Sequence, residues 1–204
     1  KKGKMYYRFS DNIACCILFE QINNTLYCNY CVVPLYIPSN AMCLCYGNRI
    51  ESLSDHSIQP LIYSQSDDVC ISWIKVVLEF IEKRVFPFFE CVDSTEKLND
   101  FLNIGFPSCK KYFSCTPEQY IRLLAYTNFV LGKKEEAVSY VAEAFRQLDV
   151  NSTISTTIIE KRKEELQHLL DLLSLSVDIQ QEYIRETISN TLNNLFHLLN
   201  LDHL

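Results

Sequence analysis

The chain has 204 residues, of which 48% are hydrophobic and 22% charged, and its formal net charge is −6. Such a composition is that of a globular protein long enough to bury a core. No window approaches the about 18 uninterrupted apolar residues of a membrane span, and no dense basic patch of the kind that binds nucleic acid is present. The start, KKGKMYYRF, lacks the apolar region of a signal peptide. We therefore expect a cytoplasmic protein that binds neither nucleic acid nor a membrane.

The first part of the chain, from Met5 to Pro38, predicts three consecutive antiparallel strands. Asp11-Asn12 and Asn23-Asn24 interrupt this stretch, and both dipeptides tolerate the positive φ that a two-residue hairpin loop needs. The segments between them are rich in aromatic and β-branched residues, which suit a pleated, buried surface. The predicted strands are Met5–Ser10, Ile13–Ile22 and Thr25–Pro34.

Two-residue turns also fix the pairing of the strands: Cys16 is expected opposite Cys31, and Glu20 opposite Tyr27. Because side chains alternate along a strand, the sheet acquires two faces. We call one the drier face, which should meet the helices and has Arg8 as its only charge; it carries Ile13, Cys15, Ile17, Phe19, Cys28, Tyr30 and Val32. We call the other the mixed face; it carries Tyr7, Phe9, Cys16, Leu18, Glu20, Tyr27, Asn29 and Cys31.

Helical patterns dominate the chain after a candidate fourth strand, Met42–Arg49, which Gly47-Asn48 is expected to turn. Ser66-Asp67-Asp68 can cap a helix and favour the positive end of its dipole. Pro87 should end that helix near Val85. Its inward apolar stripe comprises Cys70, Trp73, Ile74, Val77, Phe80, Ile81 and Val85. A short helix follows, capped by Asp93 or Ser94, with Leu98, Phe101 and Leu102 inward and a break at Gly105-Phe106-Pro107.

The strongest local signal is Thr116-Pro117-Glu118-Gln119, a capping box with proline at the first helical position. It predicts a helix to Leu131, a left-handed end at Gly132 and a second helix from about Lys134 to Leu148. This hairpin, 116–148, resembles a single tetratricopeptide unit through Leu124, Ala125, Gly132, Ala137 and Ala144. No second copy follows, so a repeat array is not expected. Two further helices are predicted within 158–200, with a break at Ser174–Asp178.

No residue of the chain carries a catalytic signature. Cys28-x-x-Cys31 and Cys43-x-Cys45 could supply four thiolates to zinc, but positions three apart on a strand point to opposite faces. We therefore expect no metal site, no cofactor and ten cysteines that are mostly reduced and structural. A cysteine nucleophile would need a nearby histidine, and His56 is the only histidine close to the sheet in sequence; we interpret it as a surface loop residue.

Candidate binding residues lie on the sheet. Tyrosine gives broad contact area at recognition surfaces, so Tyr7 and Tyr27 on the mixed face, oriented by Glu20 and Asn29, form the predicted binding surface. The alternative is that C-terminal helices cover this face as a second core layer. Arg8 on the drier face is either a ligand anchor or an edge residue whose guanidinium reaches water.

The segments KKGKMYYRF, IACCILFEQ and CVVPLYIP resemble an uncharacterised bacterial family, number 4304 in the series of domains of unknown function. The resemblance covers roughly residues 1 to 110. It implies an α+β fold and a bacterial origin, and it brings no catalytic residues.

We predict an α+β protein in which an antiparallel sheet of three to four strands is covered by helices and the C-terminal half is all helical. Residues 1–110 form the sheet domain and 111–204 the helical region, or the two form one continuous domain. The expected function is that of a non-enzymatic intracellular module binding a protein or a small molecule, and a homo-oligomer is compatible with it. The alternative is an enzyme with a cysteine or carboxylate on the mixed face.

Overall fold

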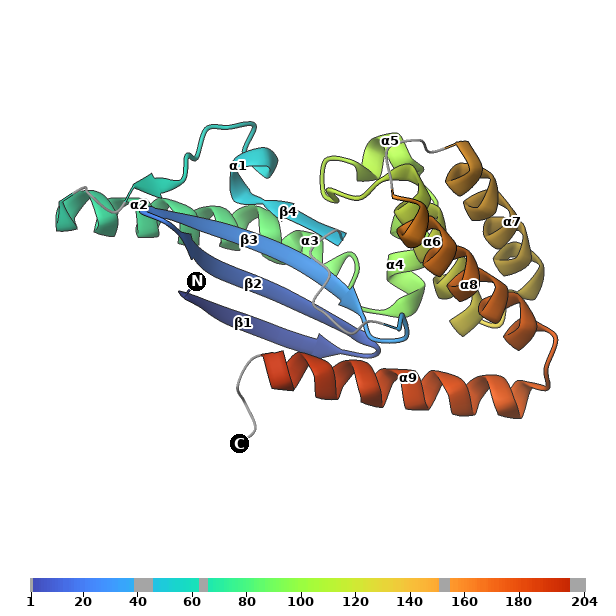
Figure 1. Ribbon diagram of the computed structural model, residues 1–204. Coiled ribbons are helices and arrows are strands. Elements are labelled where there is room, and N and C mark those ends of the chain that lie inside the picture. The colour runs from blue at the N-terminus through green and yellow to red at the C-terminus, as the bar shows by residue number, and fades with distance from the viewer. Residues whose placement is uncertain (1, 39–45, 63–65, 151–154, 199–204) are drawn as a thin grey trace. The chain divides into compact units, whose positions relative to one another are not determined.

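The protein has an α+β fold, in which an antiparallel sheet near the N-terminus precedes a helical C-terminal half, as predicted (Figure 1). The computed structural model describes the backbone of residues 2–38, 46–62, 66–150 and 155–198, and the side chains of 4–38, 46–62, 66–150 and 155–195. In the described helices, no segment is long and apolar enough to cross a bilayer.

The chain divides into two compact units, one of Lys1–Pro34 with Met42–Ser114 and the other of Leu35–Ala41 with Cys115–Leu204. The segment after the third strand, which the sequence assigns to the sheet domain, belongs to the helical unit. Tyr36 explains this, because its hydroxyl shares a hydrogen bond with that of Thr127 at 3.0 Å. Thr191 also donates to the carbonyl of Ile37 at 3.4 Å.

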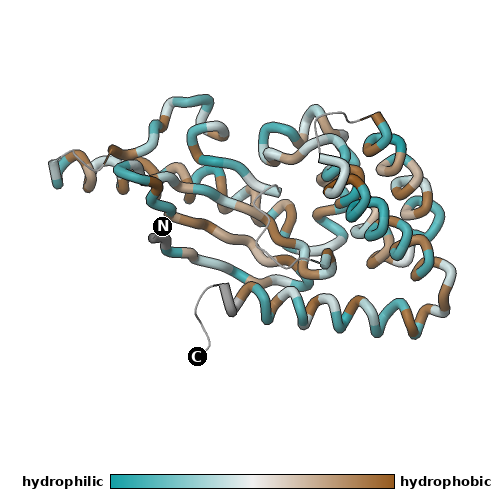
Figure 2. Tube along the Cα trace, viewed as in Figure 1, coloured by the Kyte–Doolittle hydropathy of each residue, from teal (hydrophilic) through white to brown (hydrophobic). Residues whose placement is uncertain are grey.

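The sheet contains β1 (Lys2–Ser10), β2 (Ile13–Ile22) and β3 (Thr25–Pro34), in the order β1-β2-β3-β4, and β5 also pairs with β3. The predicted register is confirmed: Cys16 pairs with Cys31, and Glu20 pairs with Tyr27. Asp11 and its counterpart in the second turn, Asn23, have φ of 49° and 53°, as the turn argument requires. Figure 2 shows hydrophobic residues running along β2, the strand between two others.

The fourth strand differs from the prediction. β4 is Gly47–Arg49 itself, paired with Asn29–Cys31 of β3, and β5 (Leu61–Ile62) pairs with the start of β3. Gly47 therefore lies inside a strand and does not turn one. The reason is close backbone approach, since a Cβ added to Gly47 would lie 1.9 Å from the carbonyl oxygen of Tyr30. Cys43 and Cys45 lie outside the described residues.

Helices α2 (Asp67–Phe80) and α3 (Phe86–Glu90) cover the drier face and are joined by a π-helical turn, Ile81–Val85. The prediction that Pro87 ends the helix is wrong. A wider π turn precedes Pro87 and removes the crowding that a proline ring creates in a regular α-helix. Short helix α1 (Ile50–Leu53) follows β4.

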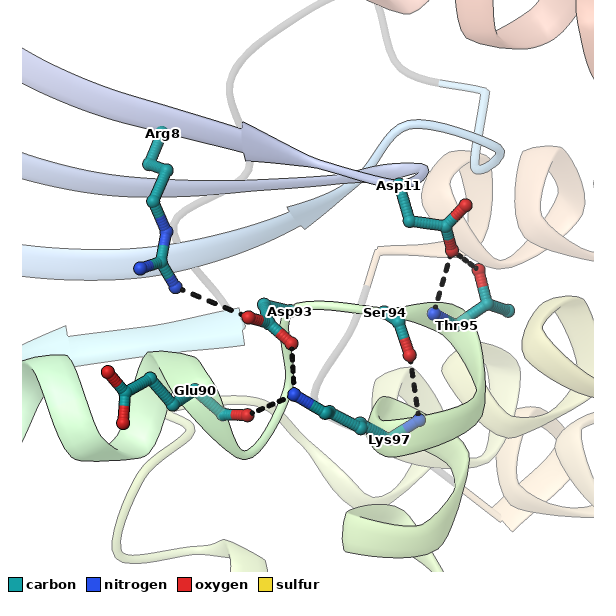
Figure 3. A network of polar contacts seen from close by, with 7 residues as sticks. All are labelled: Arg8, Asp11, Glu90, Asp93, Ser94, Thr95 and Lys97. Carbon is teal, nitrogen blue, oxygen red and sulfur yellow. Dashed lines mark hydrogen bonds and ion pairs between the residues drawn. The ribbon is translucent and has the colours of Figure 1, made fainter.

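The sheet unit ends with α4 (Thr95–Leu102) and α5 (Phe106–Cys109). Ser94 caps α4 by accepting a hydrogen bond from the backbone amide of Lys97 at 3.2 Å, as predicted. Leu98 and Leu102 are fully buried. Asp11, in the first turn of the sheet, accepts two hydrogen bonds from Thr95 at the start of the same helix (Figure 3).

In the helical unit, α6 (Pro117–Val130) and α7 (Lys134–Val150) form the predicted hairpin. Thr116 and Gln119 make both bonds of the capping box, and Gly132 has φ of 70°. Of the residues that resemble a tetratricopeptide unit, Ala125, Ala137 and Ala144 pack inside the hairpin and have no exposed surface, whereas Gly132 is exposed at its turn.

The last two helices are α8 (Thr156–Leu173) and α9 (Val177–Leu198), so the predicted break falls at Ser174–Ser176. Tyr183 of α9 contacts the rings of Phe129 and His168. Two ion pairs join α6 to α8: Arg122 to Glu165 at 2.7 Å, and Arg162 to the buried Glu118.

Candidate functional site

A groove of about 1330 Å³ lies on the drier face of the sheet. One wall is formed by β1, β2 and the start of β3, and the other by α2, the π-helical turn and α3. We call it the apolar groove. Its strand side includes Lys4, Tyr6, Arg8, Cys15, Ile17 and Phe19. Its helix side includes Ile74, Leu78, Ile81, Phe86, Phe89 and Glu90.

Two sequence periods build the apolar groove. On β2, alternation brings Cys15, Ile17 and Phe19 to one face. The pairing with β1 places Arg8 opposite Cys15 and Tyr6 opposite Ile17, so a second row lies beside the first. On α2, Ile74 and Leu78 are four residues apart and therefore lie on one side of the helix, where they form part of the opposing wall.

Over β3, the same face of the sheet is filled. The ring of Tyr30 meets those of Phe88 and Phe89, with centroids 5.8 and 6.4 Å apart. The Tyr30 hydroxyl donates to the backbone carbonyl of Tyr112 at 3.0 Å. The drier face therefore has a packed part around Tyr30 of β3 and an open part over β1, β2 and the start of β3, where Leu26 lies, and the open part is the apolar groove.

Large apolar side chains remain exposed in the open part. Tyr6 is 59% exposed, Leu78 47%, Phe86 44% and Ile74 42%. Single exposed apolar residues are ordinary on protein surfaces, whereas a contiguous set around a groove is typical of a binding site. The prediction that Ile74 points inward to the core is therefore wrong, because the helix turns this side chain into the apolar groove.

Charged groups lie at the border of the apolar groove. Arg8 lies 3.5 Å from the Asp93 carboxylate, and its side chain is half exposed. Lys97 also contacts Asp93, at 2.8 Å, and donates to the carbonyl of Glu90 at 3.0 Å (Figure 3). An ion pair this long and this exposed contributes little to stability. Arg8 thus has the edge position of one sequence interpretation, with its guanidinium reaching water, and its role as a ligand anchor stays a prediction.

The Cys15 thiol in the apolar groove is a poor nucleophile. Burial raises the pKa of Cys15 to about 12, against an opposing effect of Arg8. The thiol is therefore neutral at physiological pH, and only the thiolate is an effective nucleophile. Burial likewise raises the pKa of Cys28 to about 12. These cysteines act as small apolar side chains of the sheet.

The structure does not bring the five predicted binding residues together. Arg8 and Tyr7 line the apolar groove. Glu20 and Asn29 are buried at 9% and 6% exposure, so neither lies on an open surface. Tyr27 is half-buried, and the guanidinium of Arg49 lies 4.2 Å from the centre of its ring. Binding at the mixed face stays a prediction.

The candidate chemistry of the cysteines finds no geometric support in the described residues. Cys28 and Cys31 lie on opposite faces of the sheet, and no cluster of three metal-ligating side chains occurs in the described part of the chain. Cys16 is fully buried, and neither it nor Cys31 lines the apolar groove. His56 is exposed in its loop.

Three comparisons, with models of protein families, with curated proteins and with solved structures, found no match. The resemblance to the bacterial family of unknown function, and the origin that it implies, therefore stay predictions.

Sequence reasoning missed Tyr6, Leu78 and Phe86. A signal for Leu78 was present, because α2 is apolar on more of its circumference than one buried stripe needs. Ile71 and Val76 are also exposed, at 51% and 49%. No comparable signal marks Tyr6, because its position over an unfilled part of the sheet depends on where α2 runs.

Proposed function

We propose that the protein is a non-enzymatic interaction module that holds an amphipathic helix of a partner protein in the apolar groove. The observation that carries this proposal is the set of exposed apolar side chains on both walls, with Tyr6 on the strand side and Ile74 and Leu78 on the helix side. Helices that bind in grooves insert apolar residues spaced three and four apart.

The size of the apolar groove favours a helix over a small molecule. Small-molecule sites enclose about 300–1,000 Å³, and the apolar groove is larger, at about 1330 Å³. A helix with its side chains is about 10 Å across and rises about 1.5 Å per residue, so about three turns fill this volume. A partner helix of three turns can present one complete stripe of apolar residues to the apolar groove.

The charged residues that line the apolar groove favour one kind of partner helix. The strand wall contributes Lys4 and Arg8, and the helix wall contributes Glu90. Two cations on one border favour a partner helix that carries acidic residues beside its apolar stripe. A basic helix would meet both cations and is disfavoured.

The enzyme alternative has less support. It needs a cysteine or carboxylate of the mixed face in a hollow with a histidine, and none of the histidines that the structure describes lines the apolar groove. The mixed-face carboxylate, Glu20, is buried at 9% exposure. Transition-state stabilisation would need polar groups that converge on a reacting atom, whereas the apolar groove has mostly apolar walls.

Fluorescence anisotropy with two designed peptides tests the proposal. Both are stapled, fluorescein-labelled helices of about three turns with one leucine stripe, and they differ only in carrying glutamate or lysine beside it. We expect the acidic peptide to bind the full chain about tenfold tighter than the basic one or better. Arg8→Gln should reduce this preference.

The matched variants are Leu78→Glu and Val76→Glu. Both residues are about equally exposed on α2, at 47% and 49%, but only Leu78 lines the apolar groove. Leu78→Glu should weaken binding of the acidic peptide about tenfold or more, and Val76→Glu should leave it nearly unchanged. Equal effects of the two substitutions, or no binding by the unmodified protein, would exclude the proposal.

A further inference from the structure

A second hollow, of about 380 Å³, lies on another side of the helical segment that α2, the π-helical turn and α3 form. We call it the cationic pocket. Its walls come from the π-helical turn, the loop after α1 and the segment after α5, all within the sheet unit. No described residue lines both hollows.

Three cations line the cationic pocket: Lys83, Arg84 and Lys111. Lys83 is paired with Glu79 at 2.5 Å, and Lys111 lies 3.8 Å from Asp55. Asp55 is the only acidic residue among the described lining residues, and its side chain is 85% exposed.

Arg84 differs from the other two cations. Among the described residues, it makes no ion pair and no side-chain hydrogen bond. A guanidinium offers several donors in a planar fork that matches phosphate oxygens. The cationic pocket thus has an available phosphate-binding group beside two further positive charges.

Aromatic rings form another wall of the cationic pocket. Tyr112 stacks on Phe88, with centroids 4.7 Å apart and planes 16° apart. Phe101 meets Tyr112 edge-on at 5.5 Å. Cations and aromatic rings together suit a ligand with a charged end and a flat ring.

The backbone around the cationic pocket is specialised. Asp55 and His56 have φ of 51° and 62°, a left-handed pair in which neither residue is glycine. Ser54 and Ser57 hold this turn, because Ser57 donates its hydroxyl to the Ser54 carbonyl at 2.7 Å. On the other side, the π-helical turn carries Lys83 and Arg84. Strained turns and π turns are both frequent at functional sites.

We infer that the cationic pocket binds a phosphate monoester of a small ring-bearing molecule. Arg84 binds the phosphate oxygens, Lys83 and Lys111 add positive charge, and the ligand ring lies against Tyr112. The described lining carries three cations against the one carboxylate of Asp55, and this excess of positive charge favours a dianion over a singly charged carboxylate. The volume is within the range of sites for small ligands.

Calorimetric titration of the full chain with phenyl phosphate tests this inference, with inorganic phosphate and benzoate as comparison probes. We expect saturable binding of phenyl phosphate that is at least tenfold tighter than that of either comparison probe. Arg84→Gln should weaken it about tenfold. Lys75→Gln is the matched control, because Lys75 is exposed on α2, which leads into the π-helical turn of Arg84, and it lines neither hollow.

A second readout locates the ligand. The exposed thiol of Cys91 lines the cationic pocket, whereas the half-buried Cys70 does not. Phenyl phosphate should slow alkylation of Cys91 several-fold, as measured by peptide mass spectrometry, and leave the rate at Cys70 unchanged. The inference is overturned by absent saturation, by equal effects of Arg84→Gln and Lys75→Gln, by equal affinity for inorganic phosphate, or by unprotected Cys91.

Discussion

The carboxylate of Asp11 accepts hydrogen bonds from both the backbone amide and the hydroxyl of Thr95, at 3.1 and 3.0 Å. Asp11 has positive φ in the turn between β1 and β2, and Thr95 is the first residue of α4. One residue therefore closes a hairpin and satisfies a donor at the start of a helix. This contact fixes the end of the sheet against α4, next to the Arg8–Asp93 pair.

Asp11→Gly should destabilise the protein by about 1 kcal/mol, because it removes the contact to Thr95 but tolerates positive φ. Chemical denaturation measures this loss. Asn23→Gly is the control, since Asn23 has the same place in the second turn with φ of 53°. That substitution should be close to neutral. Similar losses for the two variants would contradict a special role of the Asp11 carboxylate.

Gly47→Ala should cost about 3 kcal/mol or more, because the added Cβ would lie 1.9 Å from the Tyr30 carbonyl oxygen. Gly132→Ala provides the comparison. There the new Cβ meets nothing within 4 Å, and only the φ of 70° is unfavourable, at about 1 kcal/mol. Denaturation midpoints of the two variants report the difference, and a smaller loss for Gly47→Ala would be inconsistent with the close approach of β4 to β3.

Ala137→Trp should destabilise the helical hairpin by about 3 kcal/mol, because Ala137 has no exposed surface. Val138, the next residue, is 39% exposed, so Val138→Trp should change the free energy of unfolding little. Thermal unfolding of both variants checks the prediction. If Ala137→Trp were as mild as Val138→Trp, the packing of α7 on α6 would have to be revised.

We expect Glu118 to make the free energy of unfolding depend on pH. Burial raises the pKa of Glu118 in the folded protein, against the opposing effect of Arg162. A carboxyl group with a raised folded pKa costs stability when ionised, and this cost disappears as pH falls below the unfolded pKa. Relative to Glu118→Gln, the unmodified protein should therefore gain free energy of unfolding between about pH 7 and about pH 4.5. A relative loss over that interval would mean that the ion pair with Arg162 outweighs burial.

Much of the fold follows from local chemistry that the sequence displays. Asp11-Asn12 and Asn23-Asn24 predict the register of the sheet, because a two-residue turn leaves no freedom in pairing. The capping box at Thr116 predicts the start of α6 for a similar reason, since both of its bonds are local. In each case, residues a few positions apart determine the structure.

The errors arose where distant segments meet. Gly47 looked like a turn residue, but it serves the approach of two strands. Pro87 looked like the end of a helix, but a π-helical turn before it accommodates the ring. The apolar groove was not predictable, because whether Ile74 and Leu78 are covered depends on how α2 lies on the sheet.

A titration followed by methyl NMR tests the central claim most directly. Ile17 and Leu18 are neighbours on β2 and lie on opposite faces of the sheet, and only Ile17 lines the apolar groove. We expect the acidic helical peptide to shift the methyl signals of Ile17, Ile74 and Leu78 in a saturable manner and to leave that of Leu18 unchanged. A shift of Leu18 without shifts of Ile17 and Leu78 would contradict the account and place the binding surface on the mixed face.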